Sequence, residues 1–259
     1  MIRTLNKHIK WRRDKKDILI CDCKRLIDLK LSLRYKSFME KLDKGIEKDN
    51  FIEEEKKVFS DFEKMKLLSN LKIRPIKLKE FDYAIKILDD ELGKDRGIKK
   101  DILSQKFKKF PEFFIGTFLD NEMVGVICGF PRQDYLLISK IAIAPIFQNR
   151  SFGKRLMEKF EEAAKGKYNK INVGARDSSV YFYKSLLGYK PFLCIQFKVG
   201  DYSKKDFDDF HIIKEYNFDS KNLVIETEIN GSDLKLLDKL RKKYPKVWFQ
   251  YIFTKRLNK

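Results

Sequence analysis

The chain has 259 residues and is strongly basic, with 57 Lys and Arg against 38 Asp and Glu and a formal net charge of +19. Its hydrophobic content of 43% suits a packed core, and no apolar run reaches membrane-spanning or signal-peptide length, so we expect a soluble cytoplasmic protein with no membrane partner. The few scattered cysteines and histidines argue against a disulfide framework and predict no metal site; they are Cys21, Cys23, Cys128, Cys194, His8 and His211.

The first region, residues 1–70, opens with a basic cluster. Residues 1–16 hold seven Lys or Arg against the single Asp14. Such a cluster attracts phosphate backbones, and Trp11 within it would stack on a base. The alternative is that the charge is the solvated surface of a lysine-rich, heat-stable protein. The RNA contact that this region suggests would use Lys7, Lys10, Arg12, Arg13, Lys15 and Lys16.

The rest of this region predicts packing elements. Cys21-Asp-Cys23 could be redox-active, but the apolar run Ile18–Ile20 before it favours one buried face of a strand or helix. Residues 31–68 are charged and periodic, which predicts two amphipathic helices broken near Asp49-Asn50. Their default role is packing or formation of a homodimer. The apolar positions are Phe38, Leu42, Ile46, Phe51, Val58, Phe62 and Met65.

The second region, residues 71–200, alternates strand and helix patterns. A strand over 71–76 precedes helices over 81–92 and 102–107, and a hairpin with strands 113–118 and 123–130 turns at Asp120-Asn121. The later elements are a strand over 135–144, a helix ending before Gly166, a strand over 171–174, a helix over 176–187 and a strand over 192–199.

The stretch from Ile141 to Leu156 is the most informative. An apolar strand stops at Pro145, and an amphipathic helix with Leu156, Met157, Phe160, Ala163 and Ala164 on one face follows a short polar loop. The first turn of a helix has unpaired N–H groups and the positive end of the helix dipole. Gly153 permits close approach, and Arg150, Lys154 and Arg155 add positive charge, so the loop is suited to a pyrophosphate.

The strand, helix and strand over 135–174 require a crossover and hence a parallel pair of strands. Ligands of such sheets bind beyond the carboxyl ends of the strands, where residues 144–153 lie. The loop sequence Gln148-x-x-Ser151-x-Gly153 resembles the Gln/Arg-x-x-Gly-x-Gly/Ala signature of the GNAT superfamily of acyl-coenzyme A N-acyltransferases. Ser151 stands where that family usually has glycine, so this position must reach its conformation with a Cβ.

A second stretch resembles a later part of the same family. Ala175-Arg176 followed by Phe182-Tyr183 keeps the family's spacing, and Gly188-Tyr189 resembles its glycine-aromatic turn. The family has three residues between that tyrosine and the glycine, whereas this chain has four. Either one residue is inserted, or the register shifts and Lys184 takes the tyrosine position.

The resemblance implies an α/β protein with a mixed α+β sheet, in which a GNAT-like core over 71–200 carries a helical N-terminal extension and a small α+β C-terminal region. It implies transfer of an acetyl group from acetyl-CoA to an unknown amine acceptor, a small molecule or a protein, without a covalent enzyme intermediate. Tyr183 would protonate the departing thiolate, unless it is a core aromatic. Acetyl-CoA would be held by Ile141, Ile143, Gln148, Asn149, Arg150, Ser151, Phe152, Gly153, Lys154 and Arg176.

The acceptor amine must lose a proton, because an alkylamine with a pKa of about 10 is charged at neutral pH. The strand over 135–144 contains no carboxylate. Asp134, Glu112 and Asp177 are nearest in sequence, and none of them is assigned as the base. A chain of water molecules, or an amine that binds neutral, serves equally well.

The third region, residues 201–259, predicts strand, strand, helix and strand over 211–216, 223–229, 234–243 and 247–253, with Ser232 as the helix cap. It could cover the acceptor site, mediate dimerisation or bind RNA. The rival interpretation of the whole chain is a catalytically degenerate module that binds RNA or the ribosome through its basic N-terminus.

Overall fold

The computed structural model describes residues 2–93, 99–132, 135–217, 219–229 and 234–257. The chain forms two compact units. Unit 1 comprises Met1–Cys128 and Lys140–Ala163, and unit 2 comprises Gly129–Ser139 and Ala164–Lys259. Strands β8 (Glu122–Arg132) and β9 (Tyr135–Ile143) contribute residues to both units. In the described ranges, no helix is long and apolar enough to cross a membrane.

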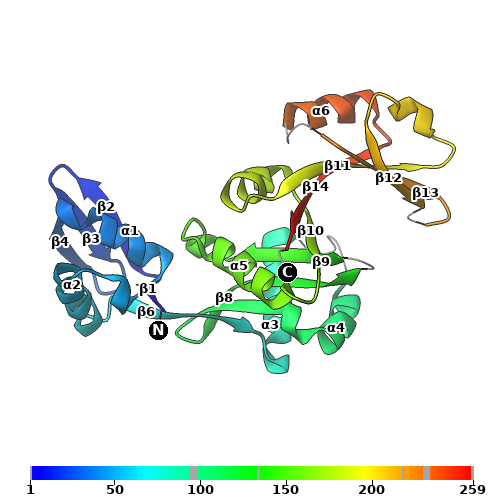
Figure 1. Ribbon diagram of the computed structural model, residues 1–259. Helices are drawn as coiled ribbons and strands as arrows, with labels where there is room; N and C mark the ends of the chain where they lie inside the picture. Colours follow the sequence, from blue (N-terminus) through cyan, green and yellow to red (C-terminus); the bar gives the residue numbers. More distant parts are fainter. Residues whose placement is uncertain (1, 94–98, 133–134, 218, 230–233, 258–259) are drawn as a thin grey trace. The chain divides into compact units, whose positions relative to one another are not determined.

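The N-terminal part of unit 1 is a small antiparallel sheet covered by two helices (Figure 1). The sheet consists of β2 (Ile9–Asp14), β3 (Asp17–Asp22) and β4 (Ile27–Ser32), and the helices are α1 (Lys36–Lys44) and α2 (Glu53–Lys64). The two predicted helices are therefore present. Their break contains β5 (Ile46–Glu47) and the 3₁₀ turn η2 (Lys48–Asn50). The shared core includes Ile18, Ile20, Phe38, Leu42, Phe59 and Phe62.

Cys21 and Cys23 do not form a buried face, so the preferred interpretation of that segment was wrong. In β3 the alternation buries Ile18, Ile20 and Asp22, whereas Cys21 is half-buried and Cys23 is exposed. The phase of a strand is fixed by its apolar residues, and here Ile18 and Ile20 direct Cys21 to the other face. The buried carboxylate of Asp22 accepts hydrogen bonds from the amides that follow the strand.

The larger sheet of unit 1 has the order β9-β8-β7-β6-β1-β5. It contains β6 (Leu68–Pro75), β7 (Phe114–Leu119) and β1 (Ile2–Leu5), which pairs with both β6 and β5. Helices α3 (Phe81–Leu92) and α4 (Lys100–Lys109) occupy the predicted positions. The 3₁₀ turn η3 (Leu78–Glu80) connects β6 to α3, and η4 (Pro111–Phe113) connects α4 to β7. A further 3₁₀ turn, η1 (Leu33–Tyr35), precedes α1. The β7–β8 turn uses positive φ at Asp120 and Asn121.

Unit 2 has the strand order β12-β13-β11-β14-β10-β9. Its strands are β10 (Lys170–Gly174), β11 (Lys190–Lys198), β12 (Ile212–Asn217), β13 (Asn222–Thr227) and β14 (Trp248–Arg256). As predicted, β9 and β10 are parallel. Strand β14 lies between β10 and β11 and is antiparallel to both. The third sequence region therefore supplies a strand to the same sheet as the second region.

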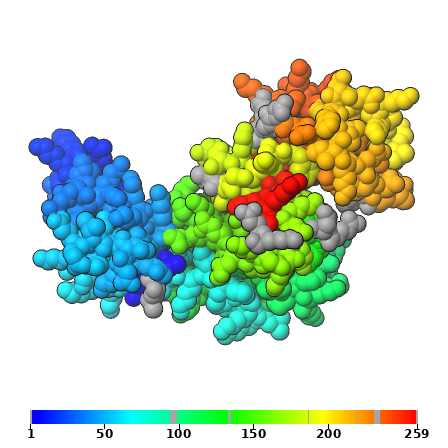
Figure 2. Space-filling model, in the orientation of Figure 1, coloured from blue at the N-terminus to red at the C-terminus, as the bar shows by residue number. Residues whose placement is uncertain are grey.

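The remaining part of that region is an insertion between β11 and β14. It contains the 3₁₀ turn η8 (Lys204–Phe207), β12, β13 and α6 (Leu234–Lys243), and its yellow and orange residues gather at the upper right of Figure 2. The order of strand, strand, helix and strand agrees with the sequence pattern. The predicted cap Ser232 lies outside the described residues.

The predicted helix over 176–187 has a different form. It begins with the 3₁₀ turn η6 (Asp177–Ser179), continues as α-helix at residues 180–181 and ends with the π-helix η7 (Phe182–Leu186). A π turn contains one residue more than an α turn. The chain likewise has one residue more between Tyr183 and Gly188 than the resemblance predicts. A π turn is what an inserted residue would produce here, and the choice between the insertion and the shifted register with Lys184 stays a prediction. Gly188-Tyr189 directly precede β11.

Candidate functional site

Residues 140–143 of β9 lie beyond the part of the strand that pairs with β10. Within the described chain, the pairs between β9 and β10 cover Leu136–Ile138. The amide of Ala144 donates to the carbonyl of Val124 on β8 at 2.9 Å. Because backbone groups alternate in direction along a strand, those of Ile141 and Ile143 point away from β8. This edge can pair with an extended chain of amides.

The loop after β9 has an unusual backbone. The 3₁₀ turn η5 (Pro145–Phe147) ends the strand, and Asn149 and Ser151 both adopt left-handed conformations, with φ of +64° and +60°. The carbonyl of Ser151 accepts the amide of Arg155 at 3.1 Å and thereby starts α5 (Phe152–Ala164). Ser151 thus reaches a glycine-like conformation with its Cβ in place. Amides 152–154 lie in the first helical turn, which suits an anion.

Gln148 ties this loop to its surroundings. Its side-chain amide donates to the carbonyl of Ile143 at 2.9 Å and to the carboxylate of Glu91 at 3.2 Å. The side chain therefore joins the end of β9 to the end of α3. Behind the loop, the buried rings of Phe147 and Phe152 stack at 6.5 Å. The sequence alone did not indicate this bracing role for Gln148.

The three cationic side chains of the loop do not converge on one site. Arg150 is buried, and its guanidinium lies 3.5 Å from the carboxylate of Asp43 and donates to the carbonyl of Leu5. Arg155 is half-buried and donates to the carbonyls of Lys44 and Gly45, and burial lowers its pKa. Lys154 is exposed beside Glu158. The backbone of the loop, with Lys154, therefore remains the predicted phosphate ligand.

Two carboxylates that sequence reasoning missed lie at the end of α3. Asp89 is 3.9 Å from the buried ammonium of Lys140 on β9, and Glu91 contacts Gln148. No local pattern could reveal them, because about fifty residues separate α3 from β9. Of the carboxylates named from sequence, Asp134 lies outside the described residues, Glu112 lies in η4, and Asp177 forms a bidentate pair with Arg241 that lowers its pKa.

In unit 2, Tyr183 is a core residue. Its side chain is 3% exposed and packs against the rings of Phe182, Tyr189 and Phe253 at 5.1 to 6.2 Å. Burial raises the pKa of its phenol. Lys184 is exposed, as is Arg176, which precedes η6. The role of Tyr183 as a proton donor stays a prediction.

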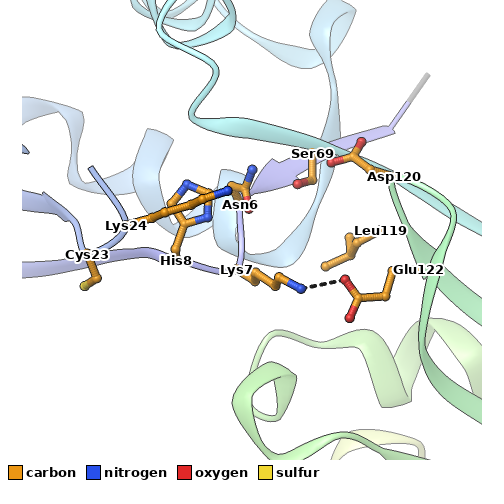
Figure 3. Close-up of a pocket in the computed structure, with 9 residues that line it drawn as sticks. All are labelled: Asn6, Lys7, His8, Cys23, Lys24, Ser69, Leu119, Asp120 and Glu122. Atoms are coloured by element: carbon orange, nitrogen blue, oxygen red, sulfur yellow. Dashed lines mark hydrogen bonds and ion pairs between the residues drawn. The ribbon is translucent and has the colours of Figure 1, made fainter. Parts of the chain in front are cut away.

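A cavity of about 540 Å³ lies elsewhere in unit 1. Figure 3 shows the ammonium of Lys7 directed at the carboxylate of Glu122, and the two groups are 2.6 Å apart. Nε2 of His8, which also lines the cavity, lies 3.5 Å from the buried Asp22. The lining has charges of both signs and includes none of the predicted acetyl-CoA residues. The lining residues are Asn6, Lys7, His8, Cys23, Lys24, Ser69, Leu119, Asp120 and Glu122.

Trp11 does not share a face with the basic residues beside it. It is opposite Ile20 in the sheet register and packs against the core, whereas Lys10 and Arg12 are opposite Cys21 and Leu19 on the other face. That face also carries Asp17, paired with Lys30 at 2.7 Å. Arg13 is exposed, and Lys15 and Lys16 form the turn before β3. Trp11 is half-buried and lines a pocket together with Lys10 and Arg12. Contact with RNA through these residues, with Trp11 stacking on a base, stays a prediction.

Among the described residues, no cluster of three or more His, Cys, Asp or Glu side chains could hold a metal ion. A search of curated proteins found no match to the sequence. Residues 81–189 match the model of the Acetyltransferase (GNAT) family, which confirms the resemblance within the expected region.

The chain is also similar to solved structures at low identity. One is described as an acetyltransferase from Pyrococcus horikoshii, with 17% identity, 57% of this chain and 50% of that chain covered, and a TM-score of 0.41. Another is a GNAT family acetyltransferase from Elizabethkingia anophelis with acetyl-CoA bound, with 20% identity, coverages of 73% and 99%, and a TM-score of 0.40. A third is N-acetylglutamate synthase from Neisseria gonorrhoeae complexed with coenzyme A and L-arginine, with 14% identity, coverages of 73% and 34%, and a TM-score of 0.41. The chain thus spans half of the first of these proteins and about a third of the last.

Proposed function

Because residues 81–189 match the GNAT acetyltransferase family, we propose that this protein transfers an acetyl group from acetyl-CoA to an amine. The observation that carries the proposal is the start of α5. Left-handed Asn149 and Ser151 precede a first helical turn whose amides, with Lys154, suit the pyrophosphate of coenzyme A. The backbone of Ile141 and Ile143 would pair with the amides of the pantetheine arm.

The proposed reaction is direct. The acceptor nitrogen attacks the thioester carbonyl, a C–N bond forms, the C–S bond breaks and the thiolate leaves. A backbone N–H on the open edge of β9 would stabilise the charge on the carbonyl oxygen. In this proposal Tyr183 gives its proton to the thiolate, and the proton that the nitrogen releases as the amide forms restores the phenol. Since burial raises the pKa of Tyr183, that transfer must be coupled to cleavage of the C–S bond.

The acceptor would arrive as an ammonium ion, since its pKa is about 10. Asp89 and Glu91 offer carboxylates at the end of α3, in contact with Lys140 and Gln148 around the end of β9. We propose that these carboxylates attract the ammonium and accept its proton. This assignment supplies the base that the sequence of β9 lacks.

Calorimetric titration with acetyl-CoA tests the proposal without knowledge of the acceptor. The comparison is between the wild type, Gly153→Glu and the control Gln105→Glu, which adds the same charge at an exposed position on α4. We expect saturable binding that Gly153→Glu abolishes and Gln105→Glu preserves, because a carboxylate at Gly153 would repel the pyrophosphate. A wild type that does not bind acetyl-CoA would overturn the proposed function.

A further inference from the structure

Arg150 is a charged residue in the middle of the phosphate loop whose side chain is directed into the N-terminal region. Its side chain is 8% exposed. Nη1 donates to the carbonyl of Leu5 at 3.2 Å, and Nε lies 3.5 Å from Oδ1 of Asp43. The residues on either side, Asn149 and Ser151, are the two left-handed residues of the loop. The anchored side chain thus belongs to the residue between them.

Arg155 makes a second connection to the same place. Its guanidinium donates to the carbonyl of Lys44 at 2.9 Å and to the carbonyl of Gly45. These are carbonyls at the C-terminal end of α1, where a helix has unpaired acceptors and the negative end of its dipole. Two arginines, one in the loop and one in the first turns of α5, therefore bind the same helix end.

The end of α1 is itself fixed on the sheet. The hydroxyl of Thr4, which is fully buried on β1, donates to the carbonyl of Asp43 at 3.3 Å. Strand β1 pairs with β6 over four residues. Burial raises the pKa of Asp43, and the charges of Arg150, Lys10 and Lys44 oppose that shift. Asp43 thus belongs to a helix end that is hydrogen-bonded to the sheet, and its carboxylate faces the loop.

We infer that Asp43 positions the phosphate loop through Arg150, so that residues 1–70 are part of the acetyl-CoA binding machinery; this inference rests on the proposed function. Left-handed conformations at residues other than glycine persist only where the surroundings hold them. The ion pair with Asp43 fixes Arg150, which lies between the left-handed residues Asn149 and Ser151. Without it, the loop relaxes and its amides no longer converge on one anion.

The test measures acetyl-CoA affinity by calorimetry and folding by thermal unfolding. The variants are Asp43→Ala, Asp43→Asn and the control Asp49→Ala, which removes an exposed carboxylate in η2 of the same region. We expect Asp43→Ala to weaken binding roughly tenfold, because it leaves the buried guanidinium of Arg150 without its charge partner. Asp49→Ala should bind like the wild type. If Asp43→Ala does not fold, Asp43→Asn, which keeps the shape and removes the charge, provides the same comparison.

A double-mutant cycle separates positioning from general destabilisation. Arg150→Ala should weaken binding to a similar extent, and adding Asp43→Ala to it should have no further effect, because Asp43 acts through Arg150. Additive losses in the cycle, or equal affinity of the wild type and Asp43→Ala, would overturn this inference while the proposed function stands. Absence of acetyl-CoA binding in the wild type would overturn both.

Discussion

The amide of Tyr189 donates a hydrogen bond of 3.0 Å to the carbonyl of Tyr183, six residues earlier. In an ordinary helix end closed by a left-handed glycine, the corresponding bond spans five residues. Here Gly188, with φ of +67°, ends a π-helix, and the added residue lengthens the span by one. The hydrogen bond that closes this longer turn therefore joins two buried tyrosines.

Deletion of Ser185 should convert the π turn to an α turn. Ser185 is exposed within η7, so its loss removes no core contact, and we expect the free energy of unfolding to fall by no more than about 2 kcal/mol. Urea denaturation with near-ultraviolet circular dichroism of the tyrosines measures this. Deletion of the buried Val180 is the control and should destabilise strongly. A Ser185 deletion as damaging as that of Val180 would contradict the explanation.

Gly45→Ala should be costly, because Gly45 has φ of +79° and a Cβ there would lie 2.7 Å from the side chain of Leu71. We expect a loss of about 3 kcal/mol, from the backbone conformation and the overpacking together. Gly166 has φ of +76°, but a Cβ there would meet no atom within 4 Å, so Gly166→Ala should lose about 1 kcal/mol. Chemical denaturation of both variants decides whether the contact with Leu71 matters; equal losses would show that it does not.

Ser151→Gly should stabilise the protein, since a left-handed backbone costs an L-residue more than it costs glycine. The expected gain is up to about 1 kcal/mol, reduced by the greater freedom of glycine in the unfolded chain. Ser60→Gly, in the middle of α2, should have the opposite sign and lose about 0.5 to 1 kcal/mol. A Ser151→Gly variant less stable than the wild type would show that the serine side chain supports the loop.

Stability should fall at alkaline pH because of buried thiols. Burial raises the pKa of Cys128, beside Lys140, and of Cys194 to about 12 each. In the unfolded chain a thiol loses its proton near pH 8.5, so between about that pH and about 12 the native state holds more protons and stability decreases as pH rises.

Each thiol contributes a slope of up to about 1.4 kcal/mol per pH unit in that window. Cys128→Ala should reduce the slope of unfolding free energy between about pH 8 and pH 10.5, whereas the exposed Cys23→Ala should leave it unchanged. Urea denaturation across this range gives both slopes. A wild type whose stability is constant there would refute the role of these thiols.

The elements predicted best are those whose information is local. Helix α3 has the predicted limits, and α5 follows from an apolar face repeated at helical spacing. The turn at Asp120-Asn121 and the loop from Gln148 to Lys154 follow from residue types that favour particular backbone conformations. In contrast, the three-stranded sheet of the N-terminal region was not predicted, because polar or charged residues occupy four of the six positions of β2 and three of the six positions of β4.

The family resemblance, the parallel pair of β9 and β10 and the polar loop between β9 and α5 followed from the linear sequence, since each rests on local patterns. Only the tertiary structure showed which residues far apart in the sequence are in contact. Folding directed Arg150 to Asp43, brought Asp89 to Lys140 and placed β14 between β10 and β11. Such pairings join residues that are roughly fifty to a hundred positions apart in the chain. A linear pattern contains no signal for them, because burial and charge select the partner only after the sheet has formed.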